Sequence, residues 1–579
     1  MGETLILDGH SRAAVEAIQA LGRSGIKVIT SAERVDAAGF SSRYAVKKLI
    51  QPKAIPPENL IHWMKDLQAR HSLDLIIPCT ENSLHAFLRI AEDEPLRRIA
   101  LLPSSHSLEI TLNKNLTNEL AGRLGIPLPS TRLVQTLAHL NTTPKFPLVL
   151  KPVRSKLAEG DELKTIEPAI VRDEHAWRSV LNDWIPRMPV LEQEHVQGWG
   201  VGIEMLYAKG KLVWYFAHER LHEWPLTGGA STYRRAIEPP KALLEASQAF
   251  LDSLQWHGVA MVEFKVRPDH SFVLMEVNPR LWGSLALSID SGVNFPLGLW
   301  KLAAGLPTEP QPQFRRGVRT RHFSGDLKWL KANLFANRND PLLLTRPALR
   351  SLIELALPML GRETWDHFQW TDPGPLIHEL GDILAFAGRA LRRRWKLMSF
   401  YLRRRALIKR AVAVRLGTHK LQSPSLLFVC QANICRSPFA AIVAKHIFAG
   451  AQIESAGFDT RVGRRTPPNV AEQAERLGFD MSECASKTLT AEHVRDADLI
   501  FVMDIVQLER LTQKFPDSRG RVIPLGLFSA NLRLEIEDPN HKDGLTTKRV
   551  LLQIASAVRK LALVLDSICG LSNARRLVS

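Results

Sequence analysis

The chain has 579 residues, of which 45% are hydrophobic and 23% are charged, a composition that suits about three or four globular domains and excludes a disordered or fibrous protein. No apolar window is long enough for a membrane span, and residues 1–30 lack a basic start followed by a hydrophobic run, so we expect a cytoplasmic protein without a signal peptide. The five scattered cysteines argue against a disulfide framework or a zinc site. The formal net charge is +17, but 14 Lys and Arg and no Asp or Glu lie between Ile383 and Ile453, so the basic character is local.

The order of the predicted elements indicates an α/β and α+β multidomain chain. Apolar runs at 4–7, 27–30 and 74–78 alternate with a helical pattern at 15–21, which predicts a parallel sheet within a domain at 1–110. Strands are predicted at 146–151, 261–265 and 272–276, the last two joined by a polar turn, within a second domain at 111–310. Residues 311–420 read as helices with Pro breaks, and a strand at 426–430 opens a further βαβ domain at 421–579.

Residues suited to a nucleotide and a metal occur in a consistent order in the second domain. Lys114 opens a helical pattern, and Lys151 ends the strand at 146–151. Glu276 and Asn278 are two apart on one strand and therefore share a face, while Glu263 lies on the preceding strand of the hairpin. Three oxygen donors of the kind that Mg²⁺ prefers can thus converge. Taken singly, Lys114 and Lys151 are better explained as surface lysines, and Glu263 as a hairpin salt bridge with Lys265.

As an ordered set, these residues resemble the ATP-grasp superfamily, in particular the carbamoyl-phosphate-synthase-like carboxylate-amine ligases, over residues 1–310. The matching segments are 114–129, 146–152, 192–198, 258–264 and 275–280. The resemblance implies a pre-ATP-grasp parallel-sheet domain at 1–110 and an ATP-grasp nucleotide-binding domain at 111–310. The implied cofactors are ATP and Mg²⁺, and the implied substrates are a small carboxylate and an amine that the sequence does not identify.

The resemblance also implies a role for individual residues. Lys114 and Lys151 would contact the ATP phosphates, and the segment 192–196, which includes Gln193 and Glu194, would hold the adenine. Arg280 would bind the acyl phosphate or its precursor. The loop at 154–164 would close over the phosphates, and the glycine turn at 226–230 would line the acceptor pocket. The implied metal ligands are Glu263, Glu276 and Asn278.

The basic segment within 384–415 has a helical pattern. Leu384, Ala387, Leu391, Trp395, Met398 and Leu402 recur at intervals of three and four residues with arginines between them. This is typical of a basic amphipathic helix that lies on an anionic membrane surface, which would make the protein peripheral at a membrane. A solvated linker helix packed against one domain explains the pattern equally well. We do not expect nucleic acid as the partner, because no base-reading motif accompanies the arginines.

The sequence CQANICRSP at 430–438 follows a hydrophobic strand and precedes a helical pattern at 439–448. A loop in this position directs backbone N–H groups and a helix N-terminus toward one point, which suits a phosphate dianion. The same field favours the thiolate of Cys430, a nucleophile, and Arg436 can hold two phosphoryl oxygens. Asn433 tolerates a left-handed conformation, and Ser437 can donate a hydrogen bond to the sulfur. Asp538, held before a proline, can supply the proton that a leaving group needs.

Together these residues resemble the low-molecular-weight protein tyrosine phosphatase family, and the likeness extends from about 424 to 579. The resemblance implies a doubly wound parallel-sheet domain that needs no cofactor, with Cys430 as nucleophile, Arg436 as phosphoryl ligand and Asp538 as general acid and then base. The substrate would be a phosphotyrosine protein or another phosphomonoester. The residues implied to support the loop are Gln431, Ala432, Asn433, Ile434, Cys435, Ser437 and Ser455.

Two departures from the family pattern concern the loop and the cleft. Ala432 stands where the family usually has Gly, and Asn540 and His541 follow Asp538-Pro539 where aromatic residues often line the cleft. Cys435 can protect Cys430 by a reversible disulfide or can simply fill space behind the loop.

Arsenate reductases share the fold, but they need resolving cysteines, and Met503 here leads into Asp504 while Cys484 and Cys569 stand alone. The sequence therefore predicts a bifunctional phosphatase and ligase. The alternative is a phosphatase that a non-catalytic, nucleotide-binding ATP-grasp scaffold regulates or localises.

Overall fold

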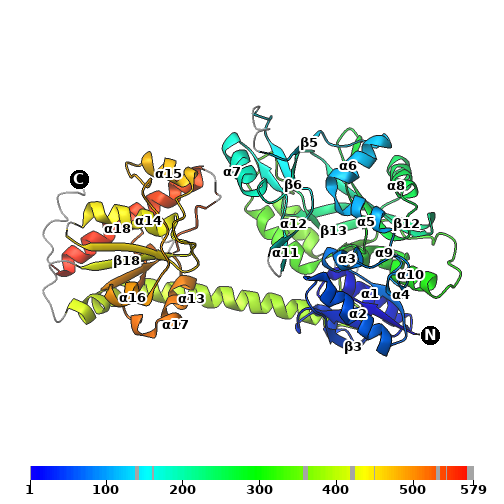
Figure 1. Ribbon diagram of the computed structural model, residues 1–579, viewed down its shortest axis with the longest axis horizontal. Helices are drawn as coiled ribbons and strands as arrows, with labels where there is room; N and C mark the ends of the chain where they lie inside the picture. Colours follow the sequence, from blue (N-terminus) through cyan, green and yellow to red (C-terminus); the bar gives the residue numbers. More distant parts are fainter. Residues whose placement is uncertain are drawn as a thin grey trace. The chain divides into compact units, whose positions relative to one another are not determined.

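The computed structural model describes residues 2–136, 143–159, 162–356, 363–416, 424–448, 450–529, 535–540, 542 and 544–569. The chain forms two compact units, Met1–Ala385 and Phe386–Ser579, and the division falls within helix α13 (Gly374–Leu416) (Figure 1). Each unit contains a parallel sheet, and the first also contains antiparallel sheets. The predicted fold class is confirmed, whereas the bounds of the four domains proposed from the sequence stay a prediction.

The first unit begins with a parallel sheet covered by helices on both faces. Its strands have the order β3-β2-β1-β4. Ile6 of β1 packs with Ile18 of α1, while neighbouring Leu5 packs with Met64 of α2 on the opposite face. Apolar residues on both sides of each strand are what a doubly covered parallel sheet requires. The elements are β1 (Glu3–Ile6), α1 (Arg12–Arg23), β2 (Val28–Ala32), β3 (Ala45–Ile50), α2 (Pro57–Arg70), β4 (Leu73–Ile77), α3 (Glu81–Phe87), α4 (Pro95–Arg98) and α5 (Ser105–Leu112).

A seven-stranded sheet follows, with the order β15-β14-β11-β12-β13-β16-β17. Its inner strands are antiparallel, and helices α6 and α8 cover one face while α9 and α10 cover the other. The elements are α6 (Lys114–Arg123), β11 (Trp199–Ala208), β12 (Lys211–Trp224), β13 (Ala230–Ala236), α8 (Lys241–Ser253), β14 (Gly258–Val266), β15 (Phe272–Asn278), α9 (Leu285–Ser291), α10 (Phe295–Ala303), β16 (Arg319–Arg321) and β17 (Thr364–Trp365). The predicted hairpin at 261–276 is the pair β14 and β15.

A smaller antiparallel sheet in the same unit has the order β5-β10-β6-β9 and packs against α7. Its elements are β5 (Thr131–Val134), β6 (Leu148–Pro152), β9 (Ala169–Val171), α7 (Glu174–Trp184) and β10 (Val190–Glu194). Strands β7 (Lys156–Glu159) and β8 (Glu162–Thr165) form a separate two-stranded sheet between β6 and β9 in the chain. Residues 160 and 161 of the predicted closing loop at 154–164 lie outside the described residues.

Residues 311–385 depart from the all-helical expectation. Helices α11 (Phe323–Leu334) and α12 (Ala348–Ala356) are present, but β16 and β17 extend the large sheet. The sequence of β16 is Arg-Thr-Arg, which has no apolar alternation, and buried ion pairs hold this region instead. Arg321 pairs with Asp326 and Glu363, and Arg234 of β13 pairs with Asp366.

We expect Asp366→Ala to destabilise the first unit by about 3 kcal/mol, because Arg234 is fully buried and would keep an unpaired charge. Differential scanning calorimetry should show a midpoint of unfolding that is several degrees lower than that of the wild type. The control is Asp382→Ala on α13, whose carboxylate is exposed. Equal midpoints for the two variants would contradict the prediction.

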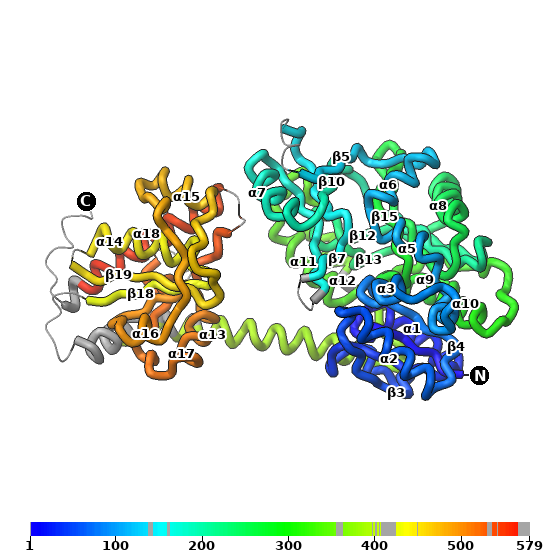
Figure 2. Tube along the Cα trace, viewed as in Figure 1, coloured from blue at the N-terminus to red at the C-terminus, as the bar shows by residue number. Residues whose placement is uncertain are grey.

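The second unit is a doubly wound domain around a parallel sheet with the order β19-β18-β20-β21. Phe428 of β18 faces α14 and α18, which lie side by side (Figure 2), and Leu427 and Val429 face α16 and α17. The elements are β18 (Ser425–Cys430), α14 (Arg436–Ile447), β19 (Gln452–Gly457), α15 (Pro468–Glu475), α16 (Ala491–Asp496), β20 (Leu499–Val502), α17 (Ile505–Lys514), β21 (Val522–Pro524) and α18 (Gly544–Cys569).

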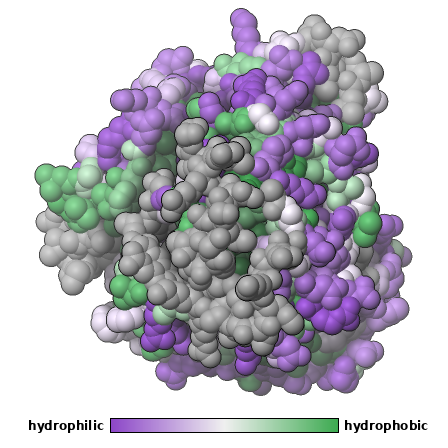
Figure 3. Space-filling view, turned by 90° about the vertical axis from the view of Figure 1, so that its left-hand side faces the viewer, coloured by the Kyte–Doolittle hydropathy of each residue, from purple (hydrophilic) through white to green (hydrophobic). Residues whose placement is uncertain are grey.

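The surface gives two further observations. The described residues on the face shown in Figure 3 are mostly hydrophilic, with smaller hydrophobic areas between them. None of the helices in the described part of the chain combines the length and the apolar character needed to span a lipid bilayer.

Candidate active sites

The candidate metal ligands of the first unit lie side by side on β14 and β15. Glu263 is paired with Glu276 across the two strands. The Asn278 side chain donates hydrogen bonds from Nδ2 to Glu263 Oε1 at 3.1 Å and to Glu276 Oε1 at 2.9 Å. The structure thus brings together the three residues that the sequence grouped, although their role as ligands stays a prediction.

The charges around these carboxylates differ. Burial raises the pKa of the Glu263 carboxyl, although Arg220 opposes this effect. Burial also disfavours charge on Glu276, but Lys114, the hydrogen bond from Asn278 and Lys151 together lower the pKa of that carboxyl. Among the described residues there is no cluster of three His, Cys, Asp or Glu side chains for a metal. The two carboxylates are hard donors that fit Mg²⁺ when phosphate oxygens or water complete the shell, whereas Asn278 directs its Nδ2 toward them and would have to rotate its amide to offer Oδ1 to the same ion.

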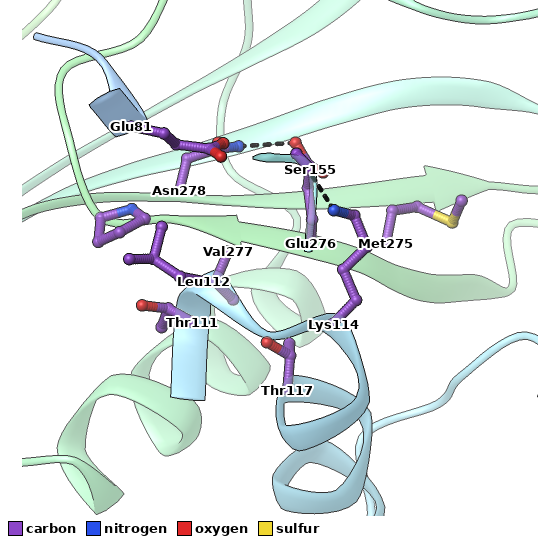
Figure 4. Close-up of a pocket in the computed structure, with 11 residues that line it drawn as sticks. Glu81, Thr111, Leu112, Lys114, Thr117, Ser155, Met275, Glu276, Val277 and Asn278 are labelled. Atoms are coloured by element: carbon purple, nitrogen blue, oxygen red, sulfur yellow. Dashed lines mark hydrogen bonds between the residues drawn. The ribbon is translucent and has the colours of Figure 1, made fainter. Parts of the chain in front are cut away.

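A pocket lies next to these ligands, and Figure 4 shows the side chains that line it. Lys114 Nζ donates a hydrogen bond to Ser155 Oγ at 2.6 Å, and Glu276 and Asn278 form another part of the wall. Glu81, at the start of α3, also lines the pocket. Sequence reasoning missed Glu81, which belongs to no spaced motif, whereas Ser155 lies in the loop at 154–164 that was expected near the phosphates but was not singled out.

The other proposed nucleotide-binding residues do not line this pocket. Lys151 is buried at the end of β6. Gln193 donates from Nε2 to Thr131 Oγ1 at 3.1 Å, and Glu194 pairs with Arg267 at 3.0 Å. Their contacts with a nucleotide therefore stay a prediction.

Arg280 lies two residues after β15, the strand that carries Glu276 and Asn278. Its Nη2 donates to Asn278 Oδ1 at 3.4 Å and its Nη1 to the Leu281 carbonyl at 3.0 Å. Its Nε is buried without a hydrogen-bond partner among the described residues. The Arg280 side chain thus lies beside the candidate metal ligands, and its Nε–H has no acceptor among the described residues.

Arg220 of β12 is a further member of the site that the sequence did not reveal. Its Nη2 donates to the Glu263 carboxylate, and its Nη1 donates to the Gly229 carbonyl at 3.0 Å. Burial works against the charge of Arg220, but Glu263 and Glu223 outweigh burial and raise the pKa of the guanidinium. Arg220 thus links the glycine turn at 226–230 to the candidate metal site. Glu263 forms its ion pair with Arg220, and not the salt bridge within the hairpin that the sequence suggested.

In the second unit, β18 ends at Cys430 and α14 begins at Arg436, so residues 431–435 form the loop that the sequence predicted. The Cys430 side chain is 3% exposed. Its Sγ accepts hydrogen bonds from the Asn433 backbone N–H at 3.3 Å and from Ser437 Oγ at 3.0 Å. Two donors therefore converge on the sulfur.

Asn433 shapes the loop through both its backbone and its side chain. Its φ of +52° is in the left-handed region, which Asn adopts more readily than most residues. Its Nδ2 donates to Ser437 Oγ at 2.9 Å and to Ser455 Oγ at 3.0 Å, and its Oδ1 accepts from the Lys487 N–H at 2.7 Å. A Cβ on Gly457, at the end of β19, would lie 2.8 Å from Asn433 N, so this position needs glycine.

Arg436 and Asp538 meet at the mouth of the loop. Arg436 Nη2 donates to Asp538 Oδ2 at 2.6 Å, and Nη1 donates to the Ile536 carbonyl at 3.1 Å. The Arg436 side chain is 6% exposed, whereas that of Asp538 is 48% exposed and can reach a ligand in solvent. The Asn540 N–H donates to Asp538 Oδ1 at 3.2 Å and fixes the orientation of the carboxyl.

The family comparisons agree with this geometry. Residues 425–568 match the family model described as low molecular weight phosphotyrosine protein phosphatase. The low molecular weight protein-tyrosine-phosphatase Ptp of Acinetobacter johnsonii is 35% identical over 123 residues, which cover 21% of this chain and 84% of the relative. The protein Etp of Escherichia coli (strain K12), of the same description, is 32% identical over 123 residues that cover 21% and 82%. The chain belongs to the low molecular weight phosphotyrosine protein phosphatase family.

The first unit has its own match. Residues 187–325 match the family model described as ATP-grasp in the biosynthetic pathway with Ter operon. Among solved structures, an L-amino acid ligase from Bacillus licheniformis is 18% identical with a TM-score of 0.42, and the match covers 52% of this chain and 74% of that one. Both resemblances are confirmed, and so is the prediction that this chain is an enzyme with a phosphatase part and an ATP-grasp part.

The structure shows the surroundings of the residues that depart from the family pattern. Ala432 is not among the described residues with left-handed φ, so its side chain adds no backbone strain to the loop. Gln431 donates from Nε2 to Asp459 Oδ2 at 2.5 Å, and Asp459 in turn pairs with Arg510. This polar chain at the loop was not predicted, since no motif links the three residues. His541 lies outside the described residues.

The remaining loop residues are Ile434 and Cys435, which belong to the hydrophobic core of the phosphatase unit. Burial, Asp538 and Cys430 raise the pKa of the Cys435 thiol. Cys430, Cys435 and Cys484 are free thiols, and the side chain of Cys569 is not described. Burial suits the packing role weighed for Cys435, while its protective disulfide stays a prediction.

Proposed function

We propose that this protein is a bifunctional enzyme, a cysteine-dependent phosphatase of phosphotyrosine proteins joined to an ATP- and Mg²⁺-dependent ligase of a carboxylate and an amine. The observation that carries the first half is the pair of donors on Cys430 Sγ, with Arg436 and Asp538 at the same loop. ATP and free Mg²⁺ are available in the cytoplasm, where we place both reactions.

In the phosphatase, the Cys430 thiolate attacks phosphorus and displaces the alcohol or phenol oxygen, which takes a proton from Asp538. Arg436 exchanges the Asp538 carboxylate for two phosphoryl oxygens, and the released carboxylate takes up a proton from solvent before it acts as the acid. The Asp538 carboxylate then accepts a proton from the water that cleaves the phosphocysteine and frees the thiolate. Ser437 and the Asn433 N–H stabilise the sulfur as it leaves.

The proposed substrate is phosphotyrosine in a protein, since the relatives are named protein-tyrosine-phosphatases. The chain has Gln431 and Asp459 at the loop and Asn540 after the Asp-Pro pair, all polar. This polarity supports another phosphomonoester as the second candidate. Comparing kcat/KM for phosphotyrosine and phosphoserine peptides separates the two.

In the ligase, bound MgATP would supply the γ-phosphoryl group that activates the carboxylate as an acyl phosphate for capture by the amine. Glu263, Glu276 and Asn278 would hold Mg²⁺ through their oxygens. Lys114 and Lys151 would bind phosphate oxygens and Gln193 and Glu194 the adenine, and Arg280 would bind the carboxylate substrate. Fixed charges of this kind act by orientation and electrostatic stabilisation.

The ligase assignment is tested by ADP release from MgATP in mixtures of carboxylates and amines, measured with a coupled assay. We expect release that depends on both substrates. Nucleotide binding without ADP release over a broad panel would instead support the alternative, a non-catalytic ATP-grasp scaffold that regulates or localises the phosphatase. Arsenate-dependent thiol oxidation in the second unit would support an arsenate reductase.

Nucleotide affinity should fall as the pH rises through the pKa of Lys151. Burial is the main cause that lowers the pKa of Lys151 to about 8. Lys114 lowers this pKa further, whereas Glu276 raises it. The side chain is therefore cationic below this pH and neutral above it. We expect the Kd for ATP to increase about tenfold between pH 7 and pH 9 in isothermal titration calorimetry. Lys151→Arg keeps its charge and should show no such increase; a wild-type Kd that is constant over this range would contradict the prediction.

A further inference from the structure

One side of α13 carries an exposed apolar stripe, formed by Leu384, Leu391, Trp395, Met398 and Leu402. These side chains are exposed by 72%, 59%, 71%, 55% and 76%, respectively. A helix that packed this stripe against a domain would bury it, so the stripe is not the face that the linker-helix interpretation would place against a domain. The five residues extend over about 27 Å of helix and have no partner among the described residues that covers them.

The opposite side of the same helix is attached to the phosphatase unit. Arg393 makes a bidentate pair with Glu535, with N–O distances of 2.7 Å, and Lys396 pairs with Glu509. Arg393 is two residues from both Leu391 and Trp395, which places it about 160° around the helix from each. These ion pairs therefore hold the helix with its apolar stripe turned away from the unit.

Arginines flank the stripe on both sides. Arg392 and Arg394 are exposed and lie about 100° from Leu391 and Trp395 in opposite directions around the helix. Arg389 and Arg403 are exposed as well. No Asp or Glu occurs between Ile383 and Ile453, so nothing acidic in this part of the sequence offsets the positive charge of the arginines.

We propose that residues 384–403 of α13 bind an anionic membrane surface. An amphipathic helix that lies in a bilayer interface directs its apolar side chains toward the acyl chains and its basic side chains toward the lipid phosphates. The stripe and the flanking arginines of α13 fit these two layers. Tryptophan is also favoured at this interface because its ring is apolar with one polar edge. Nucleic acid would match the arginines but would leave five large apolar side chains in water.

The test uses the full chain in sedimentation with lipid vesicles. We expect binding to phosphatidylcholine vesicles with about 30% phosphatidylglycerol, little binding to pure phosphatidylcholine, and weaker binding in about 0.5 M salt. The double variant Arg392→Gln/Arg394→Gln should bind about 30-fold more weakly. Its matched control is Arg559→Gln/Lys560→Gln on α18, which removes two exposed charges away from the stripe.

A second pair of variants tests the apolar contribution. Leu391→Ser should lower vesicle affinity about tenfold, whereas Leu545→Ser, which removes an even more exposed leucine from α18, should not. Hydrolysis of an aryl phosphate should be unchanged in all four proteins and serves as the check of folding. Three results would overturn the proposal: equal binding to neutral and anionic vesicles, binding to duplex DNA but not to vesicles, or self-association that Leu391→Ser abolishes in a protein that binds no vesicles.

Discussion

Cys430→Ser should hydrolyse an aryl phosphate at least about 10⁴-fold more slowly than the wild type, because an un-ionised hydroxyl replaces the sulfur nucleophile. Ser437 and the Asn433 N–H donate to Cys430 Sγ and would have no thiolate to stabilise. The measurement is the release of p-nitrophenol from its phosphate ester at saturating substrate. Cys484→Ser is the control, since this thiol is only partly buried and lies outside the loop. Retained turnover in Cys430→Ser would remove the assignment.

Asp538→Asn tests the proton transfer separately from the nucleophile. We expect kcat to fall about 10²- to 10⁴-fold, because Asn cannot protonate the leaving oxygen. The loss should be smaller for a substrate whose leaving group is a stronger acid, since such a group needs no proton. An equal loss for weakly and strongly acidic leaving groups would mean that Asp538 acts only through its ion pair with Arg436.

A large effect on the other activity is expected at the candidate metal site. Glu276→Gln should reduce ADP release at least about 100-fold, because an amide retains the shape of the side chain but lacks the charge that holds Mg²⁺. Glu276 is hydrogen-bonded to Asn278 and lies among the cations Lys114 and Lys151, so the variant also changes the balance of charge in the pocket. We expect the Mg²⁺ concentration for half-maximal rate to rise.

Glu245→Gln on α8 is the matched control, since the same substitution is made at an exposed carboxylate. The phosphatase activity of both variants reports whether the chain is folded. A Glu276→Gln protein with normal ADP release and normal dependence on Mg²⁺ would contradict the proposed metal site.

The parts of the fold that the sequence predicted best are those governed by local pattern. The apolar run before Cys430 predicted a strand at 426–430, and β18 is Ser425–Cys430. The tolerance of Asn433 for left-handed φ was expected, and its φ is +52°. Glu276 and Asn278 share a face because strand side chains alternate, which needs no knowledge of the remaining fold.

The parts that the sequence did not reveal depend on contacts between distant segments. Arg220 precedes Glu263 by 43 positions, and no spacing rule connects two strands that are joined through a third. Strands β16 and β17 are short, and β16 has no apolar residue, so their place in the sheet follows from buried charge pairs such as Arg234 with Asp366. Hydrophobic periodicity carries no information on such pairs.

The ion pair between Arg436 and Asp538 has a consequence for the design of inhibitors. A phosphate that binds to the loop at 431–435 must compete with the Asp538 carboxylate for Arg436. The displaced carboxylate then lacks a counter-ion. A simple phosphonate would leave that carboxylate unsatisfied. A zwitterionic compound, with an ammonium group a few atoms from its phosphonate, would satisfy both charges at once and should bind more tightly than the phosphonate alone.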